Sequence, residues 1–324
     1  MELLDFDQLS AEAEAFDQHV AASPLVDRYC SGSAWILPAR EVFHPDATSL
    51  VLKGEHGWAP LMVQSQVGLR IGMPLEATWC LASPFVGLDL AALAREAWAE
   101  LSRRHAAWHV LFLAGLEPGG PAIEALASLA AVRHEVGIGP SSVRCVADLA
   151  DGVDAWLARR TARFRRSLAH LRNRAASEIE YEDRDRVVPG EVDELYARIL
   201  AVERTSWKGR EGSGISSPTM QAFYARTLPR LAARGALRAT FARRAGRDVG
   251  FVFGGVLGNG YRGLQFSYDR NAAAYGLGNL LQWRTMTRLC AEGVLVYDLG
   301  MDMDYKQRWA DRRVETTSLV IRRR

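Results

Sequence analysis

The segment from Asp248 to Arg322 constrains the fold more than any other, because strand and helix signals follow one another in it without long gaps. Residues 249–257 and 261–268 are rich in β-branched and aromatic side chains. Asn259-Gly260 lies between these runs, and Asn-Gly between apolar runs is the strongest short signal for a β-hairpin. The segment therefore predicts two antiparallel strands joined by a tight turn.

The residues after this hairpin predict a glycine loop, a helix and a buried strand. The loop contains Gly276 and Gly278, the amphipathic helix covers 279–292, and the apolar strand covers 294–299. Glycines at a helix start let backbone N–H groups approach an anion, where the helix dipole adds attraction. The pattern is typical of a site for a phosphate or a pantetheine arm, and an ordinary strand-to-helix turn is the alternative.

Composition limits the class of protein. The chain has 324 residues, is 48% apolar and has a formal net charge of +2, so it predicts a large core and no general nucleic-acid surface. Its four cysteines show no CxxC pair, which excludes a simple zinc or disulfide framework. The N-terminus is acidic and amphipathic, unlike a signal peptide, and no apolar run reaches the roughly 18 residues of a membrane span. We therefore expect a cytoplasmic protein without a metal.

The pattern along the chain predicts an α+β fold with mixed, mostly antiparallel sheets flanked by helices. Two halves share an order of strand meander, helix, strand, helix and strand. We place domains at 1–150 and 151–324, with an arginine-rich connecting helix over 153–176. Among the shorter elements, the pattern predicts strands near 34–37, 49–53, 58–64, 78–81 and 108–114, and helices over 8–22, 90–104, 121–132, 191–206 and 218–234.

Asp298 ends the apolar strand 294–299, where a carboxylate is costly without a partner. Burial raises the pKa of a carboxylate, which suits a general base. A helix N-cap or an ion pair with an arginine is the alternative. Asp302 and Asp304 follow closely, and they either cap the next helix or bind a cationic acceptor amine.

Three segments give the C-terminal half a resemblance to a known family. They are the helix Arg163–Arg174 (RFRRSLAHLRNR), the loop and helix start Tyr275–Leu281 (YGLGNLL), and Asp298-Leu299-Gly300 followed by Tyr305-Lys306. In this order they resemble the GNAT acyltransferases, especially the CelD-like (cellulose-biosynthesis-type) branch related to the FemAB ligases. The resemblance covers about residues 155–312 and implies two tandem GNAT-like domains, of which the first is degenerate.

The resemblance implies a thioester donor, either acyl-CoA or an acyl carrier protein. In a GNAT-like sheet two central strands separate, and pantetheine pairs with the free edge of one of them. Ser267 and Tyr268 would line the thioester, although Tyr268 is equally explained as a strand aromatic. The implied donor-binding residues are Gln265, Phe266, Ser267, Tyr268, Arg270, Tyr275, Gly276, Leu277, Gly278 and Asn279.

The resemblance also assigns catalytic roles after the last strand. By position, Tyr305 matches the GNAT tyrosine that protonates the leaving thiolate, and Lys306 matches a FemAB-type lysine that stabilises the oxyanion. A cation at this point helps because it acts where charge develops. A surface lysine packed on Trp309 is the alternative for Lys306.

Glu203 and the sequence Ser206-Trp207-Lys208-Gly209 end a helix of the second domain. Glu203 is a candidate base or acceptor ligand, or an ordinary exposed glutamate. We expect Trp207 and Lys208 to contact the acceptor, with Lys208 holding a carboxylate or phosphate. The glycines that follow predict a mobile lid.

The arginines of helix 153–176 are either a solvated face or a docking surface for an acyl carrier protein, a phosphate or an RNA acceptor stem. The GNAT phosphate loop usually begins with Gln or Arg, and here the position is Ala273. This difference favours a carrier protein over CoA.

These observations predict an N-acyltransferase that transfers an acyl group from a pantetheine thioester to an amine of a small molecule or peptide by direct attack. Two alternatives remain: a FemAB-like transferase that uses aminoacyl-tRNA, and a non-catalytic binding protein with the same fold. No DNA partner is expected.

Overall fold

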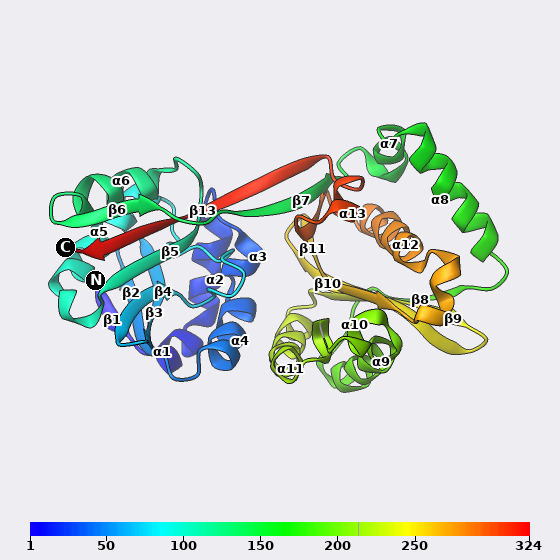
Figure 1. Cartoon of the computed structure of the whole chain (residues 1–324), viewed down its shortest axis with the longest axis horizontal. Helices are drawn as coiled ribbons and strands as arrows, with labels where there is room; N and C mark the ends of the chain where they lie inside the picture. The colour runs from blue at the N-terminus through cyan, green and yellow to red at the C-terminus, as the bar shows by residue number, and fades with distance from the viewer. Residues whose placement is uncertain (213) are drawn as a thin grey trace. The chain divides into compact units, whose positions relative to one another are not determined.

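The computed structural model describes residues 1–212 and 214–324, which form two compact units (Figure 1). Unit 1 comprises Met1–Val143 and Glu315–Arg324, and unit 2 comprises Arg144–Val314. Each unit holds a mixed sheet with helices against it, so the predicted α+β class is confirmed.

Unit 1 is built on a mostly antiparallel sheet. Its order is β1 (Glu2–Leu4), β2 (Thr48–Gly54), β3 (Gly57–Gln66), β4 (Leu69–Pro74), β5 (Val110–Leu116) and β13 (Arg312–Arg323), with β6 (His134–Ile138) also paired to β13. β4 and β5 run parallel, because α5 carries the chain back across the sheet. The helices are α1 (Phe6–Ala11), α2 (Ala13–Ala22), α3 (Arg28–Ser31), α4 (Ser33–Phe43), α5 (Leu90–Arg103) and α6 (Pro121–Ala130).

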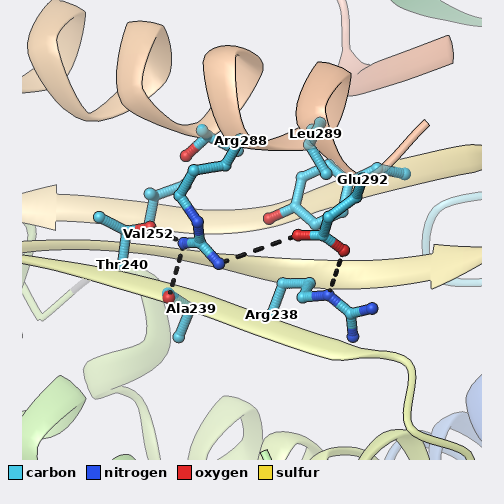
Figure 2. Close-up of a pocket in the computed structure, with 9 residues that line it drawn as sticks. Arg238, Ala239, Thr240, Val252, Arg288, Leu289 and Glu292 are labelled. Atoms are coloured by element: carbon cyan, nitrogen blue, oxygen red, sulfur yellow. Dashed lines mark hydrogen bonds and ion pairs between the residues drawn. The ribbon is translucent and has the colours of Figure 1, made fainter. Parts of the chain in front are cut away.

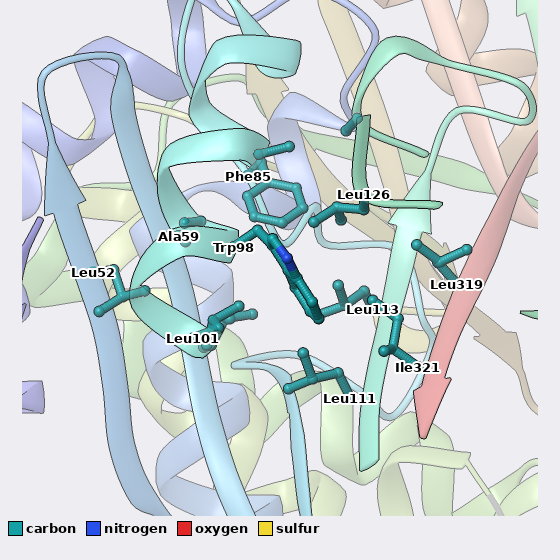
Figure 3. Close-up of a cluster of buried hydrophobic side chains, with 14 of the residues drawn as sticks. Leu52, Ala59, Phe85, Trp98, Leu101, Leu111, Leu113, Leu126, Leu319 and Ile321 are labelled. Atoms are coloured by element: carbon teal, nitrogen blue, oxygen red, sulfur yellow. The ribbon is translucent and has the colours of Figure 1, made fainter. Parts of the chain in front are cut away.

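The core of unit 1 includes side chains from the last strand of the chain. Trp98 of α5 lies in the apolar cluster between helices and strands, together with Phe85 and Leu126 (Figure 3). Leu319 and Ile321 of β13 complete the same cluster and are buried. The last strand of the chain is therefore part of the first unit's core.

Unit 2 repeats this plan. Its strand order is β7 (Ser142–Asp148), β12 (Val296–Met301), β11 (Gly260–Tyr268), β10 (Arg247–Leu257), β9 (Leu237–Arg244) and β8 (Glu180–Arg184), and here β11 and β12 are the parallel pair. α12 (Leu277–Ala291) covers one face, and α9 (Val192–Thr205), α10 (Trp207–Arg210) and α11 (Pro218–Ala233) lie on the other (Figure 1). The remaining helices are α7 (Gly152–Ala158), α8 (Ala162–Ala175) and α13 (Asp304–Gln307).

The contact-defined units differ from the predicted division at residue 150 because two strands are exchanged. β7 comes directly after the N-terminal part of unit 1 in the sequence, but it pairs with β12 of unit 2. β13 comes after unit 2 in the sequence, but it pairs with β5 and β6 of unit 1. A division by sequence position alone could not assign residues 315–324 to the first unit.

The structure corrects several predicted elements. Residues 34–37 lie in helix α4, and 78–81 form bends rather than a strand, while β4 was missed. The hairpin turn is Gly258-Asn259, one residue earlier than predicted, with Gly258 at φ +59°.

The predicted helix 153–176 is two helices, α7 and α8. Thr161 accepts a hydrogen bond from the N–H of Phe164 and starts α8 as its N-cap. Arg165 donates to the carbonyls of Ala158 and Arg160 at the end of α7. These contacts satisfy backbone groups at the end of α7 and the start of α8. They therefore favour two helices over one continuous helix here.

Within the described residues, no helix is both long and apolar enough to cross a membrane.

We predict that Ile321→Ala destabilises unit 1 by about 2–5 kcal/mol, since the substitution leaves a cavity in a closed core. Urea unfolding followed by tryptophan fluorescence measures the effect. Ile138→Ala on β6 is the control, because this side chain is 65% exposed and its loss should cost less than about 0.5 kcal/mol. Equal effects of the two substitutions would contradict the role of β13 in the core.

Candidate active site

The central feature of unit 2 is the point where β11 and β12 separate. Their parallel pairing runs from Gly260–Val296 to Arg262–Asp298. Beyond Arg262, β11 continues to Tyr268 with β10 as its described partner on one side only. The other edge of this half of β11 is open to a ligand, or to side chains, that can pair with backbone groups.

A β-bulge in β11 lies directly after the separation. Gly263 faces Gly254 and Gln265 faces Phe253, so Leu264 is an extra residue in β11. A bulge leaves its extra residue outside the regular hydrogen-bond ladder. The bulge therefore adds a backbone N–H group that is not committed to β10.

An ion-pair clamp holds the two strands together just before they separate. Asp298 of β12 forms ion pairs with Arg144 of β7 and with Arg262 of β11, the latter at 3.0 Å. Its second carboxylate oxygen accepts the N–H of Gly300 at 2.8 Å. Because this carboxylate already has three donors, the ion-pair alternative describes its contacts better.

Two lysines and two aromatic rings meet at the open edge. Lys208 donates to the backbone carbonyl of Phe266 at 3.0 Å, and its ammonium lies 5.2 Å from the Phe266 ring. The Phe266 ring also contacts the ring of Tyr305, at 5.7 Å between centroids. Lys306 donates to the carbonyl of Met301 at 3.0 Å. The structure thus brings together predicted donor, acceptor and catalytic residues.

The electrostatics of this cluster follow from burial. Burial lowers the pKa of Lys306 to about 8, while Cys145 and Asp298 act in the opposite direction. Burial likewise lowers the pKa of Lys208, and the Glu203 carboxylate opposes that shift. Burial raises the pKa of Tyr305 to about 12, so its phenol is a proton donor at neutral pH. The Lys306 ammonium lies 5.8 Å from the Tyr305 ring, while Trp309 stacks on Trp156.

Glu203 is buried beside Lys208 rather than exposed on α9. Its side chain is 1% accessible, and one carboxylate oxygen has no hydrogen-bond partner among the described residues. The other oxygen lies 3.4 Å from the hydroxyl of Ser206. A side chain on Gly214 would come within 2.6 Å of the unpartnered oxygen. Glu203 is therefore a carboxylate with free accepting capacity inside the unit.

Asp302 and Asp304 lie in different surroundings. Asp302 accepts from the Cys145 thiol at 3.1 Å and pairs with Arg313, and the thiol's hydrogen bond lowers the pKa of Asp302. Burial, followed by that hydrogen bond, raises the pKa of Cys145 to about 11, so the thiol stays neutral. Asp304 is exposed in the first turn of α13, whose N-cap is Met303.

The predicted glycine loop is compact and covered. Residues 270–275 form a 3-10 turn, and Gly276 ends it at φ +67°, a left-handed conformation that favours glycine. A side chain on Gly276 would lie 2.7 Å from Leu171 of α8. Leu171 therefore lies directly over this loop at the start of α12.

The other predicted donor residues divide between the two faces of β11. Phe266 and Tyr268 lie against Gly278 at the start of α12. Gln265 donates to the hydroxyl of Tyr224, and the Ser267 hydroxyl is buried without a partner among the described residues. Of the remaining predicted donor residues, Arg270 is exposed, Asn279 is half-buried in α12, Leu277 is buried in its apolar contact, and Tyr275 donates to Glu178. Trp207, predicted to contact the acceptor, is exposed.

Sequence reasoning missed the clamp arginines, Cys145 and the bulge. Gly263 was the available signal for the bulge, since a glycine inside a strand often marks one. A side chain there would lie 2.9 Å from Tyr297. No sequence signal paired Arg144 with Asp298, because 154 residues separate them.

A second polar hollow lies between β9 and α12 (Figure 2). Arg288 donates to the carbonyl of Ala239 at 3.2 Å, and Arg238 pairs with Glu292 at 2.7 Å. The charged side chains that line this hollow pair with one another, so we explain them as a structural network. In the chain apart from residue 213, no group of three or more His, Cys, Asp and Glu could hold a metal ion.

Comparisons with known proteins agree with this architecture. The model of an acetyltransferase (GNAT) domain matches residues 158–307. This part of the chain is a GNAT-type acetyltransferase domain. The protein is accordingly a transferase, and the predicted GNAT resemblance is confirmed for residues 158–307. No curated protein matches the sequence.

Solved structures resemble the chain over nearly its whole length. A Bacteroides thetaiotaomicron protein of unknown function has a TM-score of 0.64 at 12% identity, covering 99% of this chain and 100% of that one. FemX has a TM-score of 0.64 at 12% identity, covering 94% and 95%. The C-terminal domain of a lysylphosphatidylglycerol synthetase from Agrobacterium fabrum has a TM-score of 0.61 at 13% identity, covering 96% and 92%. At these identities the likeness shows the fold alone, and the matched regions include both units of this chain.

We predict that Asp298→Asn destabilises the GNAT domain by about 3–5 kcal/mol, because it leaves two buried guanidinium groups without their carboxylate. Thermal and urea unfolding measure the effect. Asp304→Asn is the matched control, since this carboxylate is exposed and should be near neutral. An Asp298→Asn variant of normal stability would show that the clamp does not hold the strands.

Proposed function

We propose that unit 2 transfers an acyl group from a pantetheine thioester to an amine by direct attack. The observation that carries this proposal is the open edge of β11, from Gly263 to Tyr268, beside Tyr305 and Lys306. An extended arm that pairs with this edge would bring its thioester to the bulge at Leu264. Holding both reactants in this geometry supplies much of the rate enhancement.

Each chemical step has a candidate group in this site. The acceptor reacts as a neutral amine, and Glu203 takes the proton that the nitrogen loses on attack, because its carboxylate is buried and one oxygen is unpartnered. The amine nitrogen attacks the thioester carbon, and the ammonium of Lys306 with the N–H of Leu264 stabilises the oxyanion. The C–S bond then breaks, and Tyr305 gives its phenolic proton to the leaving thiolate.

We assign Asp298 a positioning role in place of the predicted base role, since its carboxylate serves Arg144 and Arg262. Trp207 and Lys208 remain candidates for acceptor contact. Trp207 is 50% exposed next to Lys208, and Lys208 bonds to β11 itself. We propose the acceptor to be a small molecule or peptide and retain the CelD-like branch, on the three segments that first suggested it.

A second candidate is aminoacyl transfer from aminoacyl-tRNA. The near full-length likeness to FemX and to a lysylphosphatidylglycerol synthetase domain favours it. RNase treatment separates the two reactions, because it abolishes activity with an RNA-borne donor and leaves thioester-dependent activity intact.

We predict that the protein releases free thiol from acyl-pantetheine or acyl-CoA in the presence of primary amines. Glu203→Gln should lower kcat about 10²–10⁴-fold through loss of the base, and Lys306→Met about 10²–10³-fold through loss of the oxyanion cation. Thiol titration and mass spectrometry of the amide product measure both.

Matched controls exist for each substitution. Glu194→Gln lies on the exposed side of the same helix, α9, and Lys53→Met replaces a lysine of unit 1. Neither should change kcat. A non-catalytic protein would show no thiol release with any donor and amine.

We predict an alkaline limb in kcat/KM near pH 8 that belongs to Lys306. Burial places the pKa of Lys306 at about 8, below the ordinary 10.5, so the ammonium and its stabilising charge are lost as pH rises through 8. In Lys306→Arg the cation persists beyond pH 10, and the limb should move out of range. An unchanged limb in that variant would assign it to another group.

A further inference from the structure

Helix α8 carries a concentrated positive charge. Its 14 residues, Ala162–Ala175, include five arginines and no aspartate or glutamate. Leu168 and Ala175 are buried, and Leu171 joins Ala175 in the apolar contact against the start of α12. The inward stripe fixes the helix, and its arginines remain on the outer side.

Two of the five arginines, Arg163 and Arg166, are not used to hold the fold. Arg165 donates to carbonyls at the end of α7. Arg172 and Arg174 lie over the rings of Trp283 and Tyr275, at 5.3 and 5.9 Å. Arg163 and Arg166 are exposed, and no carboxylate in the described part of the chain pairs with either. This arginine face is therefore available to an anionic partner.

The arginine face lies next to the proposed donor site. α8 contacts both the 3-10 turn 270–275 and α12. Leu171, on the inner side of α8, lies directly over Gly276 and restricts the space in which a free nucleotide diphosphate could bind. Ala273 adds no cation to that loop. A donor arm is accommodated more easily when its phosphate end remains on a partner outside the domain.

The extent of the charge identifies the kind of partner. At 1.5 Å per residue, α8 is about 21 Å long, close to the length of one helix of a small protein. The whole chain has a net charge of only +2, whereas RNA binding requires a wide basic surface that follows the phosphate backbone. A basic surface confined to one helix matches an acidic helix of a small protein better than it matches an RNA duplex.

We infer that α8 is the docking surface for a small acidic carrier protein that presents its acyl group on a phosphopantetheine arm. Salt bridges with Arg163, Arg166, Arg172 and Arg174 orient the carrier, and its arm extends past Leu171 to the open edge of β11. This inference rests on the proposed thioester reaction and names its donor.

Binding of the full chain to a fluorescently labelled acidic acyl carrier protein, loaded with an octanoyl-phosphopantetheine arm, tests the surface without an acceptor. Fluorescence anisotropy should show saturable binding that weakens steeply with salt. Arg163→Glu/Arg166→Glu should weaken it at least tenfold, because two attractive contacts become repulsive. Arg95→Glu/Arg133→Glu, on exposed positions of unit 1, changes the net charge equally and should leave binding within twofold.

A kinetic comparison tests the same surface through the reaction. The ratio of kcat/KM for octanoyl-carrier to that for octanoyl-pantetheine should exceed 10 and fall at least tenfold in Arg163→Glu/Arg166→Glu. Two results overturn the inference: no carrier binding while thiol is released from acyl-CoA, or tighter, α8-dependent binding of an acceptor-stem RNA hairpin. Carrier binding through α8 without thiol release from any donor would instead support the surface and contradict the proposed reaction.

Discussion

The pairing of Asp298 with Arg144 and Arg262 is the interaction on which the site depends. It joins three neighbouring strands, β7, β12 and β11, at the last residue pair before β11 and β12 separate. A buried ion pair of this kind contributes little net stability compared with an apolar contact, but breaking it is costly. The ion pairs determine where the strands separate. β11 and β12 are held together up to the pair Arg262–Asp298 and are free to separate at the next residue.

The separated strands explain how two half-buried lysines are accommodated beside β11. Each ammonium is desolvated, and each bonds to a backbone carbonyl, Lys208 to Phe266 and Lys306 to Met301. Carbonyls that are not paired between strands are the acceptors that such ammonium groups need. The same gap that would expose β11 to a donor arm therefore also supports the two cations to which we assign roles in the proposed reaction.

The sequence predicted the elements of this site better than their contacts. The apolar runs defined β10, β11 and β12, and the glycine loop before α12 was placed within a few residues. Local patterns were sufficient because each element is periodic over its own length. They could not decide between burial and exposure at Glu203, and they missed Arg144, which reaches unit 2 only because β7 and β13 are exchanged. The burial of Glu203 and the pairing of Arg144 depend on tertiary contacts, which a short stretch of sequence does not contain.

Lys208 links the donor and acceptor sides of the proposed reaction. Its ammonium holds the carbonyl of Phe266, on the same stretch of β11 that a donor arm would pair with. An arm that binds there competes for the edge, and a displaced ammonium remains beside the Glu203 carboxylate, whose charge favours it. Lys208 belongs to α10, next to the exposed Trp207. Donor entry would therefore shift charge and side chains on the surface where we place the acceptor, which gives a physical reason for the donor to bind first.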